Sequence, residues 1–496
     1  MDIDPFSSFI SMRYAIFACL ATASKGFIHP SHRSGSMVKL AAGVIDAPFG
    51  AWESPITSKA ITSGSVGIGS LKLDTAGNLL WLEGRPQEGG RYALCRYDPS
   101  SSSKSDRNAV DITPKDSNVR TRVHEYGGGA VTLGSDGEVF YSDFADQRVM
   151  KLAKGGEDPV AITPDNEDAR YRFADGFFDA QESRLYMVRE DHTDPAPKDV
   201  VNEIVYINPN SSDDIKVVAK GNDFYSNPRL SSDGTKLAYI TWQHPNMPWD
   251  STELRVATMD DSFSAETSSH QLIAGEDGDT SVIQPMFHPS GDLFYISDET
   301  GYYNIYRTNS DGKKTSVLPM DFDFGGASPG WVFGQQGYTF LPDGRLAATY
   351  KKDGSTRLII ADVRSDGPAK SVEEYSEEDG LPMQFGGVIA SGDDLYFLGG
   401  SPSTPPSVFK WSLDKRGEAE QLACSSTLSF SDDTVSVPKQ IEFPTKLGTA
   451  FGYYYAPKNG RFTCTTDSAP PLLVKAHGGP TSCTGTSFNA GKNDWV

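Results

Sequence analysis

A short pattern of alternating apolar and polar positions recurs along the chain. Each copy is a strand, a tight turn of the Asp-Gly kind, and a second strand rich in β-branched and aromatic residues. In the copy around Gly234, for example, Leu237, Tyr239 and Thr241 fall on one face of the second strand. Because an Asp-Gly pair supplies the positive φ that a two-strand turn needs, the pattern predicts a β-hairpin.

Seven copies of this hairpin follow one another at intervals of about 45 to 60 residues, which is the size of one four-stranded propeller blade. They begin at Leu71, Val131, Phe177, Arg229, Phe287, Phe340 and Val388. Glycines mark most of the turns, at Gly77, Gly137, Gly234, Gly291, Gly344 and, shifted in register, Gly392. The third copy has Gln181-Glu182-Ser183 instead. A β-sandwich would not repeat one hairpin seven times, so residues 46–430 are predicted to form a seven-bladed β-propeller.

The pattern changes after residue 430. Two strands with a turn at Lys446 to Thr449 are predicted first, then a polar loop, FTCTTDSAPP, and then an apolar strand, LLVKAH. That strand ends in His477, Gly478, Gly479 and Pro480. A buried strand followed by a His-Gly-Gly loop is the arrangement that builds one half of an oxyanion hole in α/β-hydrolases. Residues 431–496 are therefore predicted to be the N-terminal fragment of an incomplete α/β-hydrolase domain.

The propeller and the PPLLVKAHGGPTS segment together resemble the prolyl oligopeptidase family of serine peptidases, in its acylaminoacyl-peptidase and dipeptidyl-aminopeptidase-like branch. The resemblance extends over residues 46–482 and includes APFGAWESPIT, RTRVHEYGGGA and WQHPNMPWD within the predicted propeller. It implies a hydrolase that cleaves short peptides by acyl transfer, in which the propeller gates access and no cofactor or metal takes part. A homo-oligomer stays possible.

The family's Ser, Asp and His follow the His-Gly-Gly loop, so no catalytic residue is assigned within these 496 residues and the chain itself is predicted to be inactive. The last residues, CTGTSFNAGKNDWV, also depart from the family pattern. One G-x-S-x-G match exists, Gly326 to Gly330 around Ser328. Pro329 suits a strained nucleophile elbow poorly, so the match is interpreted as a loop between blades. A propeller that only binds peptides or proteins is the alternative function.

Two groups of polar and aromatic residues within the blades are further candidates. His124 and Glu125 face the propeller channel in one interpretation and pin a blade by hydrogen bonds in the other, which is favoured. Trp242, His244 and Trp249 are expected to pack along a blade edge rather than to contact substrate. The loop SPSTPPS, residues 401–407, is expected at the surface.

Charge and composition narrow the partners. The formal net charge is -21, which argues against nucleic acid and anionic membranes as partners. No run of 18 apolar residues predicts a transmembrane helix. Five separated cysteines indicate free thiols in a reducing compartment, with no metal site.

Residues 1–45 differ from the rest in composition. The stretch from Pro5 to Ile45 has seven serines and four basic residues but no acidic residue. This composition favours a transit peptide for a plastid or mitochondrion. An untargeted, cytoplasmic tail and a secretory signal remain alternatives, as does a start at Met37. We expect this segment to be largely unpacked.

Overall fold

The computed structural model describes residues 43–62, 64–100, 109–156, 158–260, 264–325, 330–426, 428, 430–467, 469–478 and 484–493. These residues form two compact units. One comprises Ile56–Phe430 with Val474–Trp495, and the other comprises the described part of Met1–Pro55 with Ser431–Leu473. The change of unit after Phe430 coincides with the change of sequence pattern. The expected N-terminal segment, residues 1–45, lies almost entirely outside the described residues.

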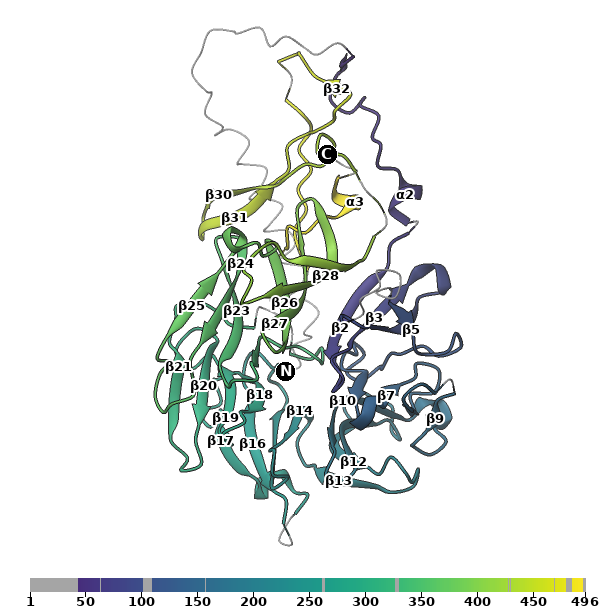
Figure 1. Ribbon diagram of the computed structural model, residues 1–496, viewed down its shortest axis with the longest axis vertical. Coiled ribbons are helices and arrows are strands. Elements are labelled where there is room, and N and C mark those ends of the chain that lie inside the picture. Colours follow the sequence, from purple (N-terminus) through teal and green to yellow (C-terminus); the bar gives the residue numbers. More distant parts are fainter. Residues whose placement is uncertain are drawn as a thin grey trace, which may run out of the picture. The chain divides into compact units, whose positions relative to one another are not determined.

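The larger unit is a seven-bladed β-propeller, and each blade is a four-stranded antiparallel sheet whose strands are paired in chain order (Figure 1). Blade 1 contains β2 (Gly67–Leu73), β3 (Leu79–Arg85), β4 (Arg91–Tyr97) and β5 (Val110–Asp111). Blade 2 contains β6 (Val131–Leu133), β7 (Val139–Ser142), β8 (Val149–Leu152) and β9 (Val160–Ala161). Blade 3 contains β10 (Tyr171–Asp179), β11 (Arg184–Asp191), β12 (Val201–Ile207) and β13 (Ile215–Ala219). Blade 4 contains β14 (Phe224–Leu230), β15 (Lys236–Trp242), β16 (Glu253–Thr258) and β17 (Gln271–Ala274).

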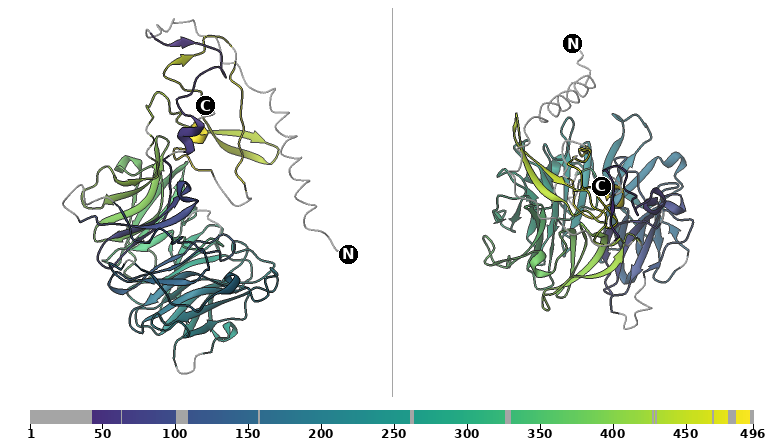
Figure 2. Two further views of the ribbon diagram at one scale, coloured as in Figure 1. Left: turned by 90° about the vertical axis from the view of Figure 1, so that its right-hand side faces the viewer. Right: turned by 90° about the horizontal axis from the view of Figure 1, so that it is seen from above.

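The remaining blades follow the same order. Blade 5 contains β18 (Val282–Phe287), β19 (Leu293–Ser297), β20 (Asn304–Thr308) and β21 (Lys314–Leu318). Blade 6 contains β22 (Tyr338–Phe340), β23 (Leu346–Lys352), β24 (Ser355–Ala361) and β25 (Val372–Tyr375). Blade 7 contains β26 (Gln384–Ser391), β27 (Asp394–Ser401), β28 (Thr404–Ser412) and β29 (Glu420–Cys424). Figure 2 gives two further views of the chain.

The seven predicted hairpins are confirmed, because each one forms the first two strands of a different blade. The turn glycines adopt the positive φ that the Asp-Gly pattern predicted, for example 72° at Gly234 and 93° at Gly291. In the third copy Ser183 takes this conformation instead, with a φ of 50°. Local turn chemistry therefore fixes the first hairpin of every blade.

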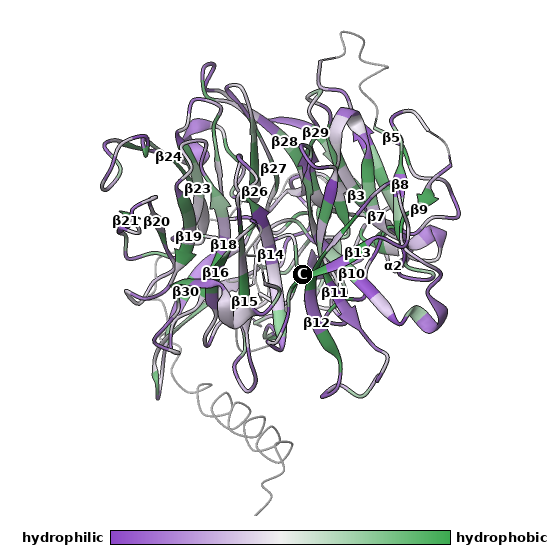
Figure 3. Ribbon diagram, turned by 90° about the horizontal axis from the view of Figure 1, so that it is seen from below, coloured by the Kyte–Doolittle hydropathy of each residue, from purple (hydrophilic) through white to green (hydrophobic). Residues whose placement is uncertain are grey.

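The core lies between the blades. Each neighbouring pair of blades shares one cluster of buried apolar side chains. Figure 3 shows hydrophobic stretches along the strands of the blades. The ring closes in the same way, because Trp81 and Tyr97 of blade 1 pack in one cluster with Tyr396 and Val408 of blade 7. Stacking thus buries both faces of each sheet, which a single blade could not do.

The smaller unit contains one hairpin and one short parallel pair. Strand β30 (Lys439–Thr445) pairs with β31 (Gly448–Tyr454), and β1 (Ile45–Asp46) pairs with β32 (Phe462–Thr463). The predicted two strands are confirmed, although the turn is shorter than expected. Helix is scarce: α2 (Ser58–Thr62) and α3 (Ala490–Asn493) belong to the larger unit. No α/β-hydrolase domain is formed within the described residues, and none of their helices is long and apolar enough to cross a membrane.

Three local predictions are wrong. The segment from Leu472 to His477 is extended but pairs with no strand, and Leu472, Leu473 and Val474 are exposed. A buried strand needs partners on both sides, which the described residues do not provide. Phe462 and Thr463, expected in a loop, form β32 instead. Residues Thr404–Ser407 likewise belong to β28, where a register shift accommodates the two prolines.

Candidate functional site: a strap across one end of the propeller

The most unusual feature of the propeller is the loop between blades 5 and 6. Its residues 330–337, called here the strap, contact the loop that leads into blade 2. The amide of Phe333 donates a hydrogen bond of 3.1 Å to the carbonyl of Gly127, and Gly128 pairs with Phe333 as a parallel bridge. Blades 2 and 6 are not neighbours in a ring of seven. The strap therefore crosses the ring, at the end where the chain enters β2 and leaves β29.

Three consecutive glycines make this crossing possible. Gly127, Gly128 and Gly129 have φ values of 73°, 89° and 60°, which strain any residue with a side chain. A Cβ on Gly128 would lie 2.3 Å from the carbonyl oxygen of Phe333, and one on Gly129 would lie 2.9 Å from the amide of Asp175. The motif VHEYGGG, called here the strap receptor, therefore forms the surface that the strap contacts.

His124 is clamped beneath the strap. Its ring lies 4.7 Å from that of Phe333, with Phe224 and Trp242 edge-on at 5.5 and 5.7 Å. Its Nδ1 lies 3.1 Å from the carbonyl oxygen of Trp331, which accepts the bond if Nδ1 is protonated, and its Nε2 is buried without a hydrogen-bond partner. Burial lowers the pKa of His124, although the nearby Glu190 opposes this shift.

Glu125 points elsewhere. Its carboxylate is exposed and forms an ion pair with Arg172 at 2.5 Å. The buried neighbour is Glu190, which accepts a hydrogen bond of 2.7 Å from the amide of His124 and lies 2.9 Å from the Nε2 of His192. The structure therefore does not bring His124 and Glu125 together as a pair. It places His124 inside and Glu125 at the surface.

The aromatic residues of WQHPNMPWD pack around the strap. Trp242 stacks on Phe224 with ring centroids 5.2 Å apart, and the ring of His244 lies edge-on to Phe224 at 5.0 Å. Trp249 contacts Trp331 at 4.6 Å, and Trp331 in turn stacks on Tyr126 at 5.3 Å. The predicted packing role is confirmed: Trp242 and His244 pack on Phe224 of their own blade, whereas Trp249 packs on the distant strap.

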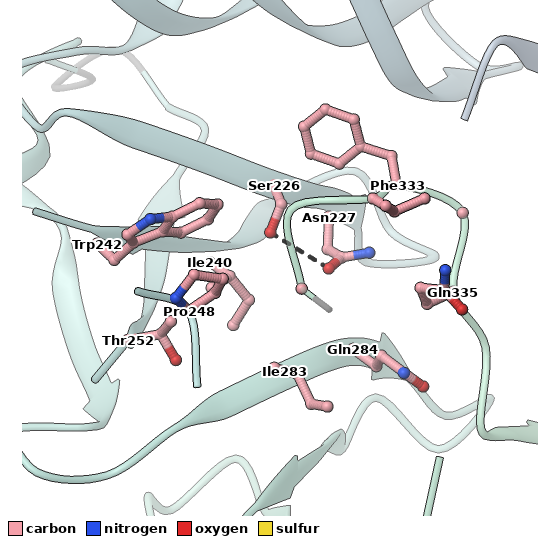
Figure 4. A pocket seen from close by; sticks show the side chains of 13 residues that line it. Ser226, Asn227, Ile240, Trp242, Pro248, Thr252, Ile283, Gln284, Phe333 and Gln335 are labelled. Carbon is pink, nitrogen blue, oxygen red and sulfur yellow. Dashed lines mark hydrogen bonds between the residues drawn. The ribbon is translucent and has the colours of Figure 1, made fainter. Parts of the chain in front are cut away.

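A small pocket opens beside the strap, with about 410 Å³ of empty space that is partly open to solvent (Figure 4). Its walls are apolar side chains and amides from blades 4 and 5 together with the strap. Asn227 and Gln284 sit at positive φ in their strands, at 52° and 55°. The Oε1 of Gln284 accepts a hydrogen bond of 2.6 Å from the amide of Gly337, which anchors the end of the strap.

The oxyanion-loop candidates are only partly described. His477 and Gly478 are exposed, and the Nδ1 of His477 lies 3.4 Å from the carbonyl oxygen of Gly478. Gly479 and Pro480 lie outside the described residues, as does Ser328 of the G-x-S-x-G match. The role of this loop stays a prediction.

Metal and thiol chemistry find no site in what is described. Within the residues that the structure describes, no group of three His, Cys, Asp or Glu side chains gathers to hold a metal ion. Cys95 and Cys424 are free thiols, and burial raises the pKa of Cys95 strongly.

Solved structures resemble this arrangement over most of its length. A puromycin-hydrolyzing peptidase of Mycobacterium tuberculosis matches 91% of this chain with 26% identity and a TM-score of 0.80, and this chain covers 67% of that protein. A puromycin hydrolase matches the same share with 26% identity and a TM-score of 0.79, 68% of it being covered. The chain is therefore similar in structure to peptidases of the prolyl oligopeptidase family. Its likeness is to the acylaminoacyl-peptidase-like branch.

More distant members of the family share the fold alone. Prolyl oligopeptidase B from Galerina marginata matches 79% of this chain with 10% identity and a TM-score of 0.57, and 56% of that protein is covered. No family model and no curated protein sequence matches the chain. The resemblance that the sequence motifs indicated is thus confirmed by structure.

Proposed function

We propose that this chain is the propeller, with the opening strands of the α/β-hydrolase domain, of a serine peptidase that cleaves short peptides. The observation that carries the proposal is the match to the puromycin-hydrolyzing peptidase over 91% of the chain, with 26% identity and a TM-score of 0.80. The chain covers about two thirds of that peptidase. Its activity is therefore a proposal for the whole protein of which these residues form part.

Residues after 430 support this assignment by their exposed apolar surface. Phe443 and Phe451 of the hairpin β30–β31 are 41% and 63% exposed, and Leu472 and Leu473 are 75% and 66% exposed. Side chains of this kind suit burial against the rest of a hydrolase sheet. In the proposed enzyme the amide groups of Gly478 or Gly479 donate to the oxyanion, while the nucleophile, base and acid come from residues beyond this sequence.

The strap gives the propeller its part in this function. It spans the end of the ring from which the chain continues to residue 431 and forms part of the surface there. We propose that this surface limits access to the catalytic groups, with His124 and Trp331 holding it shut.

Two preparations test the proposed function: this chain, and this chain extended by the hydrolase segment of a family member. Each is treated with a serine-reactive fluorophosphonate and with short chromogenic peptides. We expect labelling and turnover only in the extended form, and loss of both when the Ser of its G-x-S-x-G elbow is changed to Ala. Labelling of the 496-residue chain that disappears in Ser328→Ala would contradict the proposal. Peptide binding by a chain that stays inactive after extension would favour a binding module instead.

A further inference from the structure

The inner strands of five blades carry a bulge at the same level. In β2 the pairing with β3 shifts between Gly69 and Lys72, and in β14 the pairing with β15 shifts between Ser226 and Arg229. Each bulge contains a residue at positive φ, such as Ser70 at 55° and Asn227 at 52°. Lys72 and Arg229 are thus equivalent residues of blades 1 and 4, each where the ladder resumes.

Arg229 interacts with groups of three other blades. One of its guanidinium nitrogens lies 3.4 Å from the carboxylate of Asp175 in blade 3. Burial lowers the pKa of Lys72 in blade 1, the charge of Arg229 lowers it further, and Asp175 opposes both effects. Burial raises the pKa of Tyr338 in blade 6, and the charge of Arg229 opposes that rise. Blades 1 and 6 are not neighbours of blade 4, so only a group near the axis acts on both.

The charges at this level do not balance. The carboxylate of Asp175 accepts a hydrogen bond of 2.6 Å from the amide of Asn227 in addition to its ion pair with Arg229. Lys72 has neither a hydrogen bond nor an ion pair among the described residues, although its side chain is half-buried and surrounded by protein. Two cations therefore share one carboxylate within a chain whose net charge is -21. An unpaired cation away from bulk water is unfavourable, and an anion would stabilise it.

We propose that Lys72 and Arg229 form a carboxylate-binding site on the propeller axis, and that its occupant is the C-terminal carboxylate of a short peptide. A guanidinium fork and an ammonium at equivalent positions of two inner strands suit a single carboxylate. The amides of Asn227 and Gln284 line the pocket beside the strap and match the hydrogen-bonding groups of a peptide backbone. The choice of a peptide rests on the proposed function, whereas the anion site does not. Polyanions are disfavoured because the remainder of the protein is acidic.

Binding to the 496-residue chain tests this site without any catalytic step. Isothermal titration calorimetry compares an acetylated tripeptide with its C-terminally amidated twin, with acetate and phosphate as further ligands. We expect the free acid to bind at least about 10-fold more tightly than the amide, acetate and phosphate to bind more weakly than the acid, and added salt to weaken binding of the acid. The variant Lys72→Met should lose at least about 10-fold in affinity for the acid. Lys236→Met is the matched control, because Lys236 is exposed at the outer end of a blade hairpin and its loss should change nothing.

Each other outcome contradicts the proposal. Equal affinity for acid and amide, unchanged binding in a Lys72→Met variant that keeps its melting temperature, or no binding of any ligand would remove the carboxylate site. Acetate as good as the peptide acid would show a site for free carboxylates, and tighter phosphate binding would show a different anion. A failure of the extended chain to hydrolyse peptides leaves these results standing, because they depend on binding alone.

Discussion

The blades and the segment that follows them use similar residues with opposite results. In the blades, large aromatic side chains such as Phe294 and Tyr295 are completely buried between neighbouring sheets. In the hairpin β30–β31, Phe451 is 63% exposed and Leu447 is fully exposed. Both regions pair their strands with good register. The difference shows that an alternating strand pattern specifies a hairpin, whereas burial depends on a second sheet to receive its apolar face.

The largest effect is expected at the strap receptor. Gly128→Val combines a φ of 89° with a backbone oxygen 2.3 Å from the new Cβ, so neither the loop nor the strap can relax easily. We expect a loss of about 4 kcal/mol or more in the free energy of unfolding, measured by urea denaturation. The control is Gly291→Val, whose φ is 93° but which has open space around it, and it should lose clearly less. Equal losses would mean that the strap does not hold the loop.

A second pair of variants compares the two regions directly. Phe294→Ala removes a completely buried ring and should lower the free energy of unfolding by about 3–5 kcal/mol. Phe451→Ala removes an exposed ring from β31 and should change stability by less than about 0.5 kcal/mol. Thermal unfolding of both variants measures this contrast. A large loss for Phe451→Ala would show that the hairpin is buried in solution by something outside the described residues.

A third substitution isolates turn strain within one blade. Gly234 has a φ of 72°, and a Cβ added there would have the side-chain oxygen of Gln181 as its nearest neighbour beyond the turn, 3.8 Å away. A valine side chain has space at this position, but it strains a backbone with positive φ. Gly234→Val should therefore lower the free energy of unfolding by about 1–3 kcal/mol. Denaturation of this variant beside Gly128→Val separates strain from collision. No measurable loss would argue that the turn changes type.

The most gradual effect is one of pH, and it arises from two histidines of the larger unit. Burial lowers the pKa of His124 and of His270, whose Nδ1 lies 2.7 Å from the hydroxyl of Tyr239. The unfolded chain therefore takes up protons that the folded chain refuses once the pH falls below about 6.5. Stability should fall below that pH, with a slope approaching about 1.4 kcal/mol per pH unit for each ring.

Unfolding between pH 7.5 and 5 measures this slope. His270→Gln should flatten it, whereas His477→Gln, which replaces an exposed ring, should leave it as it is. A profile that His270→Gln does not change would place the acid sensitivity elsewhere.

The blades could be predicted from the sequence because the residues that specify each hairpin lie close together in the chain. An Asp-Gly turn and its two strands lie within about fifteen residues, and Gly234 adopts the conformation that its neighbours predict. The strap was missed because its contacts join residues far apart, as in the 207-residue separation of His124 and Trp331. The one available signal was the run Gly127 to Gly129, which required an explanation that no turn provides. The strand predicted at Leu472 failed for the opposite reason, since its pattern was right but its neighbours were missing.

The strap also changes how the ring should respond to partial unfolding. A propeller whose blades contact only their neighbours resembles a linear array that has been joined end to end, and such arrays can fray one unit at a time. The loops before blades 2 and 6 are joined directly by the Phe333–Gly127 hydrogen bond and by the stacked rings of Tyr126 and Trp331. These contacts link two blades that are not neighbours in the ring. Unfolding of any blade between blades 2 and 6, on either side of the ring, then disturbs the contacts between these two loops. The ring is thereby expected to lose its structure as a whole rather than blade by blade.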